Sequence, residues 1–401
     1  MKNITYKCIE CNKEIQTKDV VYLCPDCSKN YIPGMPLKGI LLVELDYEFI
    51  RNRYSKTFDI KLFNPIDLKY FPNIKVGHTP FYKSEQLSNY FGFDNIFVKN
   101  DTLNPSGSLK DRASYLVVAE ANRLGIDEIV TASTGNAASA LACICAADGK
   151  KATIMVPENA PEAKLIQILQ FGAQLIKIKG TYDDAFKVSL EYSNKKNVLN
   201  RNTAYHPFTI EGKKTVGLEI FVQNFNHVPD VILIPVGDGV ILSGVYKAFL
   251  DLKKSGITNK MPRLVAVQAE KSSAIHNFVV SGVFEKYSNP DTLADSISVS
   301  VPSAALLAYR AIKETNGFSL TVTDDEILQA QLLLSQKAGL FVEPSSATVV
   351  AALNKLKNSE LINPKEQIVL LLTGSGLKDL KSATKLLKFP EKSIQSINDL
   401  I

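Results

Sequence analysis

From about residue 95 onward, the chain alternates short apolar runs with stretches of helical periodicity. There are three clear examples of an apolar run followed by a helical stretch: 152–156 followed by 162–171, 175–178 followed by 182–192, and 264–267 followed by 272–280. Pro161, Gly172 and Gly180 separate some of these segments. Such alternation is typical of parallel β-sheets covered by helices, so we predict an α/β fold.

The composition limits the classes of protein to which the chain can belong. Its 401 residues are enough for two domains and a small module, and 45% hydrophobic with 22% charged residues is ordinary for a globular protein. The formal net charge of +5 is mild for this length and predicts no nucleic-acid or membrane partner. The longest nearly uninterrupted apolar stretch, residues 137–147, is too short to span a bilayer.

Lys110 follows a turn rich in Gly, Ser and Pro, and it begins a stretch of helical periodicity. The turn reads Asn104-Pro105-Ser106-Gly107-Ser108-Leu109-Lys110. A lysine held in such a turn can form a Schiff base with a carbonyl cofactor. An ordinary strand–turn–helix junction with a surface lysine explains this window equally well.

Two further turns between a predicted strand and a predicted helix contain small polar residues. The first turn precedes the helix at 137–147 and consists of Ser133, Thr134, Gly135 and Asn136. Its hydroxyls and free N–H groups are suited to bind a carboxylate; a plain N-cap is the alternative. The second turn follows the apolar run 231–235 and consists of Gly237, Asp238, Gly239 and Val240. Its backbone N–H groups are suited to bind a phosphate; an ordinary tight βα turn is the alternative. The Asp238 carboxylate would repel an anion, so we expect the backbone to make the contact.

Thr373 directly follows the apolar run 368–372 and precedes Gly374-Ser375-Gly376. Ligands of open α/β sheets bind at the carboxyl ends of strands. A hydroxyl at this place is a neutral partner for a pyridine nitrogen. Without the other turns, a tight strand–helix connection would be the preferred interpretation.

Four cysteines near the N-terminus form two pairs, Cys8-x-x-Cys11 and Cys24-x-x-Cys27. Each pair can place two thiolates on one side of a metal, and together they predict a tetrahedral, structural zinc site. The chain opens on a polar run without the apolar core of a secretory signal, so we expect a cytoplasmic protein with reduced thiols. Reduced thiols favour zinc over two disulfides, the alternative.

Together, these segments resemble the pyridoxal phosphate enzymes of the tryptophan synthase β family, which have fold type II. Within that family they are most similar to the threonine synthase group. The resemblance covers roughly residues 75 to 385 and depends on the segments 77–80, 104–112, 133–136, 210–215 and 373–379. We therefore expect a large three-layer parallel-sheet domain from 34–105 and 205–390, a small one from 106–204, and a zinc-ribbon module at 1–33.

The resemblance also implies a role for each matching residue. Lys110 would bind the cofactor as a Schiff base and then act as acid and base. Asn136 would hydrogen-bond the cofactor's phenolic oxygen, and Thr373 would face its ring nitrogen. The cofactor phosphate would contact Gly237, Asp238, Gly239, Val240 and Ile241. The substrate carboxylate would contact Ser133, Thr134 and Gly135.

Three residues depart from the pattern of the threonine synthase group. Thr209 replaces an arginine that usually binds the substrate phosphate, and threonine has neither a charge nor a fork of donors. His206 stands where Asn is common, and Ser375 where His is more usual. We place Thr209 and Lys214 in the predicted substrate site. The nearest basic residues that could bind the phosphate are Lys213, Lys214 and Arg201, and His206 could add a donor.

Three functional hypotheses follow. The first is a homodimeric threonine synthase-like lyase that converts O-phosphohomoserine and water to threonine and phosphate. The second keeps the cofactor but changes the substrate, to O-phosphoserine for cysteate or cysteine synthesis, or to serine or threonine for deamination; the replacement at Thr209 motivates it. The third is a non-catalytic sensor or scaffold, which Lys110 disfavours because a buried lysine without a cofactor is costly.

Overall fold

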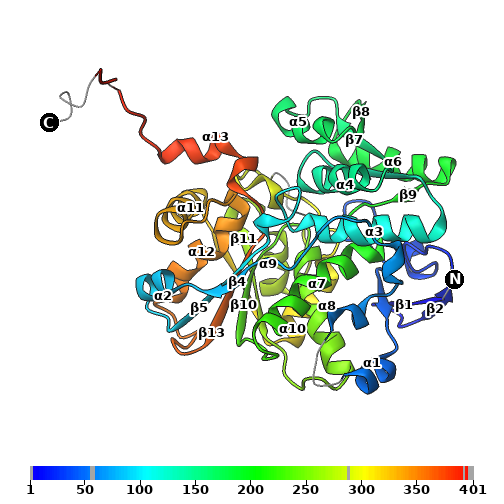
Figure 1. Cartoon of the computed structure of the whole chain (residues 1–401), viewed down its shortest axis with the longest axis horizontal. Helices are drawn as coiled ribbons and strands as arrows, with labels where there is room; N and C mark the ends of the chain where they lie inside the picture. Colours follow the sequence, from blue (N-terminus) through cyan, green and yellow to red (C-terminus); the bar gives the residue numbers. More distant parts are fainter. Residues whose placement is uncertain (1–2, 55–58, 287–289, 392, 396–401) are drawn as a thin grey trace.

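The computed structural model describes residues 3–54, 59–286, 290–391 and 393–395. These residues form a six-stranded sheet, a four-stranded sheet and a small three-stranded sheet (Figure 1). The strands are β1 (Ile4–Cys8), β2 (Glu14–Thr17), β3 (Leu41–Glu44), β4 (Phe81–Lys83), β5 (Asn95–Asn100), β6 (Glu128–Ala132), β7 (Lys151–Pro157), β8 (Gln174–Ile178), β9 (Leu199–Asn200), β10 (Val231–Pro235), β11 (Arg263–Ala269), β12 (Phe318–Val322) and β13 (Gln367–Leu372).

The helices lie between these strands along most of the chain, as the alternating pattern predicts. They are α1 (Tyr47–Arg53), α2 (Glu85–Phe91), α3 (Lys110–Leu124), α4 (Asn136–Ala147), α5 (Glu162–Gln170), α6 (Tyr182–Lys196), α7 (Pro207–Gln223), α8 (Val240–Lys254), α9 (Ala274–Ser281), α10 (Ala305–Glu314), α11 (Asp324–Ala338), α12 (Pro344–Leu356) and α13 (Leu380–Ala383). Capping boxes begin α6 at Thr181 and α11 at Thr323. Among the helices described, none is long and apolar enough to cross a membrane.

The six-stranded sheet has the order β12-β11-β10-β13-β5-β4 and is covered on both faces. Along β10, Val231 and Leu233 join one apolar cluster, while Ile232 and Ile234 join another. Helices α2, α11 and α12 pack on the first face, and α7, α8 and α10 on the second (Figure 1). A strand buried on both faces is apolar throughout, which explains the uninterrupted run in the sequence.

One strand of this sheet corrects the prediction of purely parallel sheets. The edge strand β4 pairs antiparallel with β5, whereas the other pairs of the sheet are parallel. A parallel pair needs a crossover of a dozen or more residues. The connection from β4 to β5 spans only 84–94, so the chain returns in the opposite direction.

The four-stranded sheet, β8-β7-β6-β9, is parallel throughout and lies beside the larger one. Its apolar side chains pack on α3, α4 and α5, and α6 covers the other face (Figure 1). Its strands lie between residues 128 and 200, inside the segment 106–204. The exact domain bounds stay a prediction.

The small sheet, β2-β1-β3, takes its third strand from beyond residue 33, so the predicted module boundary is too early. Leu41–Glu44 lies in the segment 34–75, whose described residues also include α1 and two short 3-10 helices. Buried side chains of the sheet, among them Ile4 and Tyr6, share an apolar cluster with Phe208 of α7. The N-terminal residues are thus packed on the core of the protein.

A buried ion-pair network fixes the first turn of α3. The guanidinium of Arg112 donates to both carboxylate oxygens of Asp101, at 2.6 and 2.8 Å, and to both of Glu219, at 2.6 and 2.8 Å. Lys99 donates to Glu219 at 2.6 Å. These four residues are at most 3% exposed. Because Lys110 lies two residues before Arg112, the network also fixes the start of its helix.

We predict that Arg112→Met lowers the free energy of unfolding by about 3–5 kcal/mol, because it leaves two carboxylates buried with too little compensating charge. Denaturant titration measures this loss. The matched control is Arg263→Met, whose partner Glu366 is 25% exposed and whose pair is worth about 0–1 kcal/mol. Equal losses in the two variants would contradict the role given to the network.

Candidate active site

The turn that carries Lys110 is bonded directly to the turn that carries Thr373. Leu109 donates its N–H to the Thr373 carbonyl at 2.9 Å, and Ser375 donates to the Gly107 carbonyl at 2.9 Å. Gly107 has a φ of +82°, a conformation that favours glycine. The structure therefore brings together two turns that are more than 250 residues apart in the sequence.

A cavity lies where Lys110 meets the carboxyl end of β10. Its walls come from α3, the β9–α7 segment, α7, the β10–α8 loop and the segment before α10. The residues that line it are Lys110, Ala137, Arg201, Thr203, Lys213, Pro235, Val236, Gly237, Asp238, Gly239, Val240, Ile241, Leu242, Ser296 and Ile297. All residues predicted to contact the cofactor phosphate are among them.

The β10–α8 loop has the shape of an anion cradle. Gly239 has a φ of +84° and caps α8, whose first N–H groups have no acceptor within the helix. A Cβ at Gly237 would lie 2.7 Å from the Cα of Ile297, so only glycine fits there. The Asp238 carboxylate instead accepts from Ser303, from its hydroxyl at 2.6 Å and from its N–H. The carboxylate thus has a protein partner, and backbone contact with an anion stays a prediction.

Burial makes the Lys110 amine more reactive as a nucleophile. Burial lowers the pKa of its amine, and the positive charges of Arg201 and Lys378 lower it further, while Glu343 and Asp238 oppose the shift. A lower pKa increases the fraction of neutral amine, which is the nucleophile.

Two more cations line the same cavity. Lys213 is 3% exposed, and its ammonium has no hydrogen-bond or ion-pair partner among the residues described. Burial lowers its pKa well below the ordinary value, and Arg201 and Lys110 add to this effect. Arg201 is 1% exposed, and within the described part of the chain its guanidinium donates only to neutral acceptors, the Ser114 hydroxyl at 3.1 Å and the Lys110 carbonyl at 3.4 Å. Buried positive charge of this kind suits an anionic ligand.

Asn136 is bonded to two residues that the sequence analysis did not select, Glu343 and Ser296, and of these Ser296 lines the cavity. The Asn136 amide donates to Glu343 at 2.9 and 3.1 Å and to the Ser296 hydroxyl at 3.1 Å. Glu343 is 4% exposed, and its burial raises the pKa of its carboxyl. A Cβ at Gly374 would overlap the Glu343 carboxylate, so this carboxylate can lie there only because residue 374 is glycine. Glu343 precedes Pro344 at the start of α12, a common helix-start pattern that gives no signal of a site.

Thr373 is 2% exposed, and its hydroxyl lies 3.1 Å from that of Ser346. Ser346 also accepts from the N–H groups of Thr373 and Gly374, at 2.9 and 2.8 Å. The Thr373 side chain is therefore held in place by a second hydroxyl.

The predicted carboxylate loop lies outside the cavity lining. Ser133, Thr134 and Gly135 are partly exposed, and the Ser133 hydroxyl accepts from the Gly135 N–H at 3.2 Å. The ammonium of Lys378, in the loop after β13, reaches across to helices α4 and α5. It donates to Ser139 at 3.1 Å and to Gln167 at 2.7 Å.

The structure corrects the prediction for Lys214. Its ammonium lies in a buried cluster, where it pairs with Glu211 and with Asp251 at 2.9 Å. Thr209 also turns away, because its hydroxyl donates to the carbonyls of Thr203 and His206. Neither residue lines the cavity, whereas Lys213 does. Neighbouring helix residues point about 100° apart, so only one of two successive lysines can face the site.

The four N-terminal cysteines form a second candidate site. Their sulfur atoms lie within 4.8 Å of one another, and those of Cys11 and Cys24 are 3.7 Å apart. Four thiolates at about 2.3 Å from a zinc ion would be about 3.8 Å apart at the corners of a tetrahedron. None of these cysteines is in a disulfide. Cys143 and Cys145 are buried in α4, away from this cluster.

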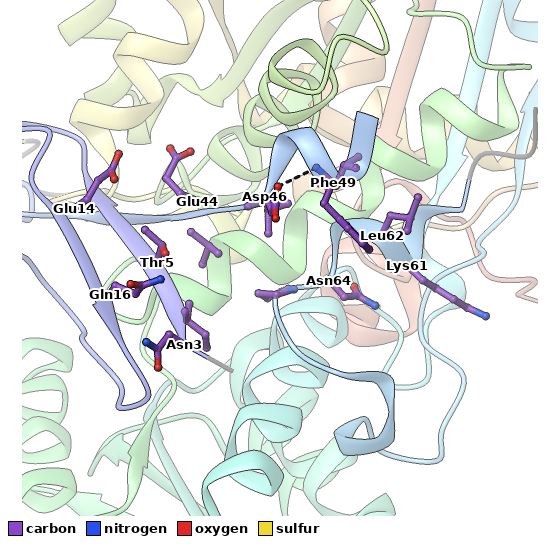
Figure 2. Close-up of a pocket in the computed structure, with 15 residues that line it drawn as sticks. Asn3, Thr5, Glu14, Gln16, Glu44, Asp46, Phe49, Lys61, Leu62 and Asn64 are labelled. Atoms are coloured by element: carbon purple, nitrogen blue, oxygen red, sulfur yellow. Dashed lines mark hydrogen bonds between the residues drawn. The ribbon is translucent and has the colours of Figure 1, made fainter. Parts of the chain in front are cut away.

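A larger hollow, of about 540 Å³, lies between the small sheet and the segment around α1. Figure 2 shows Glu14 and Glu44 on one side of it and Lys61 and Asn64 on the other. None of the predicted cofactor, substrate or metal residues lines it.

Comparison with known proteins agrees with this geometry. Residues 73–374 match the model of the pyridoxal-phosphate dependent enzyme family. The threonine synthase of Methanocaldococcus jannaschii is 34% identical, over 96% of each chain. That of Halalkalibacterium halodurans is 36% identical, over 77% of this chain and 84% of its own. The chain belongs to the pyridoxal-phosphate-dependent enzyme family.

Solved structures show the same fold. Maize serine racemase superposes with a TM-score of 0.65 at 24% identity, over 75% of this chain and 88% of its own. The processed form of threonine deaminase isoform 2 from Solanum lycopersicum superposes with a TM-score of 0.64 at 23% identity, over 77% of this chain and 88% of its own. The fold type II architecture expected from the sequence is therefore confirmed.

Proposed function

We propose that this chain is a threonine synthase that converts O-phosphohomoserine and water to threonine and phosphate. The observation that supports this most is one buried cavity containing Lys110, an N–H cradle and two cations without carboxylate partners in hydrogen-bond contact. Such a cavity suits a phosphate group. The threonine synthases of similar sequence support the choice of substrate.

The residues present fit pyridoxal phosphate. The cofactor phosphate would occupy the N–H cradle at Gly237 to Ile241, where only glycine fits at position 237. Lys110 would bind the cofactor's carbonyl carbon covalently, Asn136 its phenolic oxygen, and the Thr373 hydroxyl would face its ring nitrogen. When bound, the cofactor withdraws electrons from the substrate and makes its Cα proton acidic.

The protein then supplies proton transfer and charge stabilisation. The Lys110 amine would remove the proton from Cα and transfer protons during the later steps, for which a lowered pKa is suited. Arg201 and Lys213 would bind the substrate phosphate and stabilise it as it leaves Cγ, before water adds at Cβ. The partly exposed loop Ser133–Gly135 would hold the substrate carboxylate. Its hydroxyls and N–H groups are the donors for that group.

O-phosphoserine is the second candidate substrate. The same two cations would bind its phosphate. They do not by themselves distinguish substrates whose carbon chains differ in length. Turnover assays with O-phosphohomoserine, O-phosphoserine, serine and threonine distinguish the two. We further propose that the enzyme is a cytoplasmic homodimer, with a small domain at residues 106–204.

We also propose a structural zinc ion at Cys8, Cys11, Cys24 and Cys27. The spacing of the sulfur atoms matches a tetrahedral thiolate site. Cys8 and Cys24 are fully buried, and all four positions are occupied by protein ligands, so the metal would have no open position for catalysis.

The first prediction concerns the covalent bond to the cofactor. Borohydride should fix pyridoxal phosphate to Lys110, and peptide mass spectrometry locates the modified residue. Lys110→Ala should lose both the yellow colour and the modification, since no amine remains at that position. The exposed Lys195 is the matched control, and Lys195→Ala should behave as the unaltered protein. Modification of another lysine would contradict the assignment.

The second prediction concerns the two cations. Lys213→Met should raise KM for O-phosphohomoserine roughly tenfold to a hundredfold, because a charge-assisted hydrogen bond contributes about 1.5–3 kcal/mol. Arg201→Met should do the same, and Lys195→Met should not. Cofactor absorbance should persist in all three variants. An unchanged KM in both cavity variants would exclude this phosphate site.

The pH dependence provides a further check on Lys213. Its pKa is lowered in the absence of a ligand, and a bound phosphate raises it, so binding takes up a proton. Inorganic phosphate should therefore bind more weakly as pH rises through the lowered pKa of Lys213. Calorimetry in buffers of different ionisation enthalpy measures the proton uptake, which Lys213→Met should reduce.

The third prediction concerns the metal. Metal analysis should find one zinc per chain, and Cys24→Ser should lose it. Because structural zinc stabilises its own module, limited proteolysis should then cleave within the N-terminal residues first. Cys143→Ser is the matched control and should retain the metal. Four free thiols in a metal-free native protein would contradict the proposal.

A further inference from the structure

The cysteine module is in direct contact with the segment that carries Arg201. This segment runs from Asn200, at the end of β9, to His206, at the start of α7. The Tyr22 hydroxyl, from the module, accepts the N–H of Asn200 at 3.0 Å. The Tyr22 ring stacks on that of Tyr205, with centroids 4.6 Å apart, and meets that of His206 edge to face at 5.3 Å. One side chain of the module thus contacts both ends of the segment.

Tyr22 lies in the chain segment between the two cysteine pairs of the four-cysteine site. It lies two residues before Cys24, whose N–H donates to the Gly39 carbonyl at 2.7 Å. On the other side, the Lys18 carbonyl accepts from the guanidinium of Arg123 in α3 at 2.7 Å. The position of Tyr22 therefore depends on the module being folded and attached to α3.

The position of Arg201 depends in turn on this segment. Its N–H donates to the Val130 carbonyl of β6 at 2.8 Å, and its guanidinium contacts only neutral acceptors. Because no carboxylate holds the guanidinium by a hydrogen bond, its direction is set mainly by the backbone from which it projects. The preceding residue, Asn200, is the one bonded to Tyr22.

We propose that Tyr22 is a positioning residue for the phosphate site, and that the metal module thereby sets the affinity of the enzyme for its anionic substrate. Tyr22 keeps Asn200 and the rings of Tyr205 and His206 in place, and so directs Arg201 into the cavity. This inference rests on the proposed function only for the identity of the anion. The coupling between module and cavity does not depend on which phosphate ester is the substrate.

The test uses the full-length holoenzyme, with its cofactor phosphate bound, and inorganic phosphate as the probe. Tyr22→Phe removes the acceptor of the Asn200 N–H and retains the ring. Calorimetry should show phosphate binding weakened roughly twofold to tenfold, the range expected for one hydrogen bond. KM for O-phosphohomoserine should rise by the same factor, while kcat and cofactor absorbance stay unchanged. Tyr31→Phe, a 43% exposed tyrosine close to Cys27 in sequence, is the matched control and should change neither.

Removal of the metal by a chelator tests the second half of the inference. It should weaken phosphate binding in the unaltered enzyme, and by a smaller factor in Tyr22→Phe, because the two changes share the hydrogen bond to Asn200. Fully additive effects, or no effect of chelation on phosphate binding, would overturn the coupling to the metal. If the chelated protein unfolds, phosphate binding by Tyr22→Phe alone tests the inference, since this variant retains all four cysteines.

The outcomes separate this inference from the proposed function. Phosphate binding equal in Tyr22→Phe and the unaltered enzyme overturns the inference, whatever the substrate is. Loss of the cofactor in Tyr22→Phe also overturns it, because the residue would then support the whole fold. No turnover of O-phosphohomoserine by the unaltered enzyme, together with weakened phosphate binding in Tyr22→Phe, overturns the function and supports the inference.

Discussion

Three positive side chains meet in one buried cavity, and the rest of the structure holds them there. Lys110, Arg201 and Lys213 line it together, and the Asp238 carboxylate that lies nearby is already bonded to Ser303. Burying charge without a partner is costly. Arg201 lowers the pKa of both lysines, and Lys110 lowers the pKa of Lys213 further. An anionic ligand removes this cost, so the site favours phosphate binding before any chemistry takes place. The residues around it must be rigid enough to keep the three charges from moving apart.

The rigidity comes from contacts that join distant parts of the chain. The Arg112 network attaches α3 to the end of β5 and to α7, and the hydrogen bonds between the Lys110 and Thr373 turns attach it to β13. The four-stranded sheet provides Asn136 and Arg201, while the six-stranded sheet provides the N–H cradle and Thr373. The site thus lies where the two sheets meet, which is where ligands of α/β proteins commonly bind.

The sequence alone predicts those elements of the fold and of the candidate site that leave a local sequence pattern. Short apolar runs before Gly-rich turns identified β10, β13 and the cradle after β10, because a buried strand and a tight turn each leave a local signal. Glu343 was missed because its role arises from a long-range contact with Asn136. Lys214 was chosen in place of Lys213 because the direction of a helix face cannot be read where the whole helix is buried, as α7 almost entirely is. The antiparallel edge strand β4 is three residues long and has no periodicity to detect.

The central claim is that the cavity binds O-phosphohomoserine and that phosphate leaves from its Cγ. Turnover in water enriched in the heavy oxygen isotope tests this most directly, with mass spectrometry of both products. The account predicts threonine and phosphate in equal amounts, with the heavy isotope in the threonine hydroxyl and none in the phosphate. Label in the phosphate, or no phosphate from O-phosphohomoserine while O-phosphoserine, serine or threonine is consumed, would contradict it.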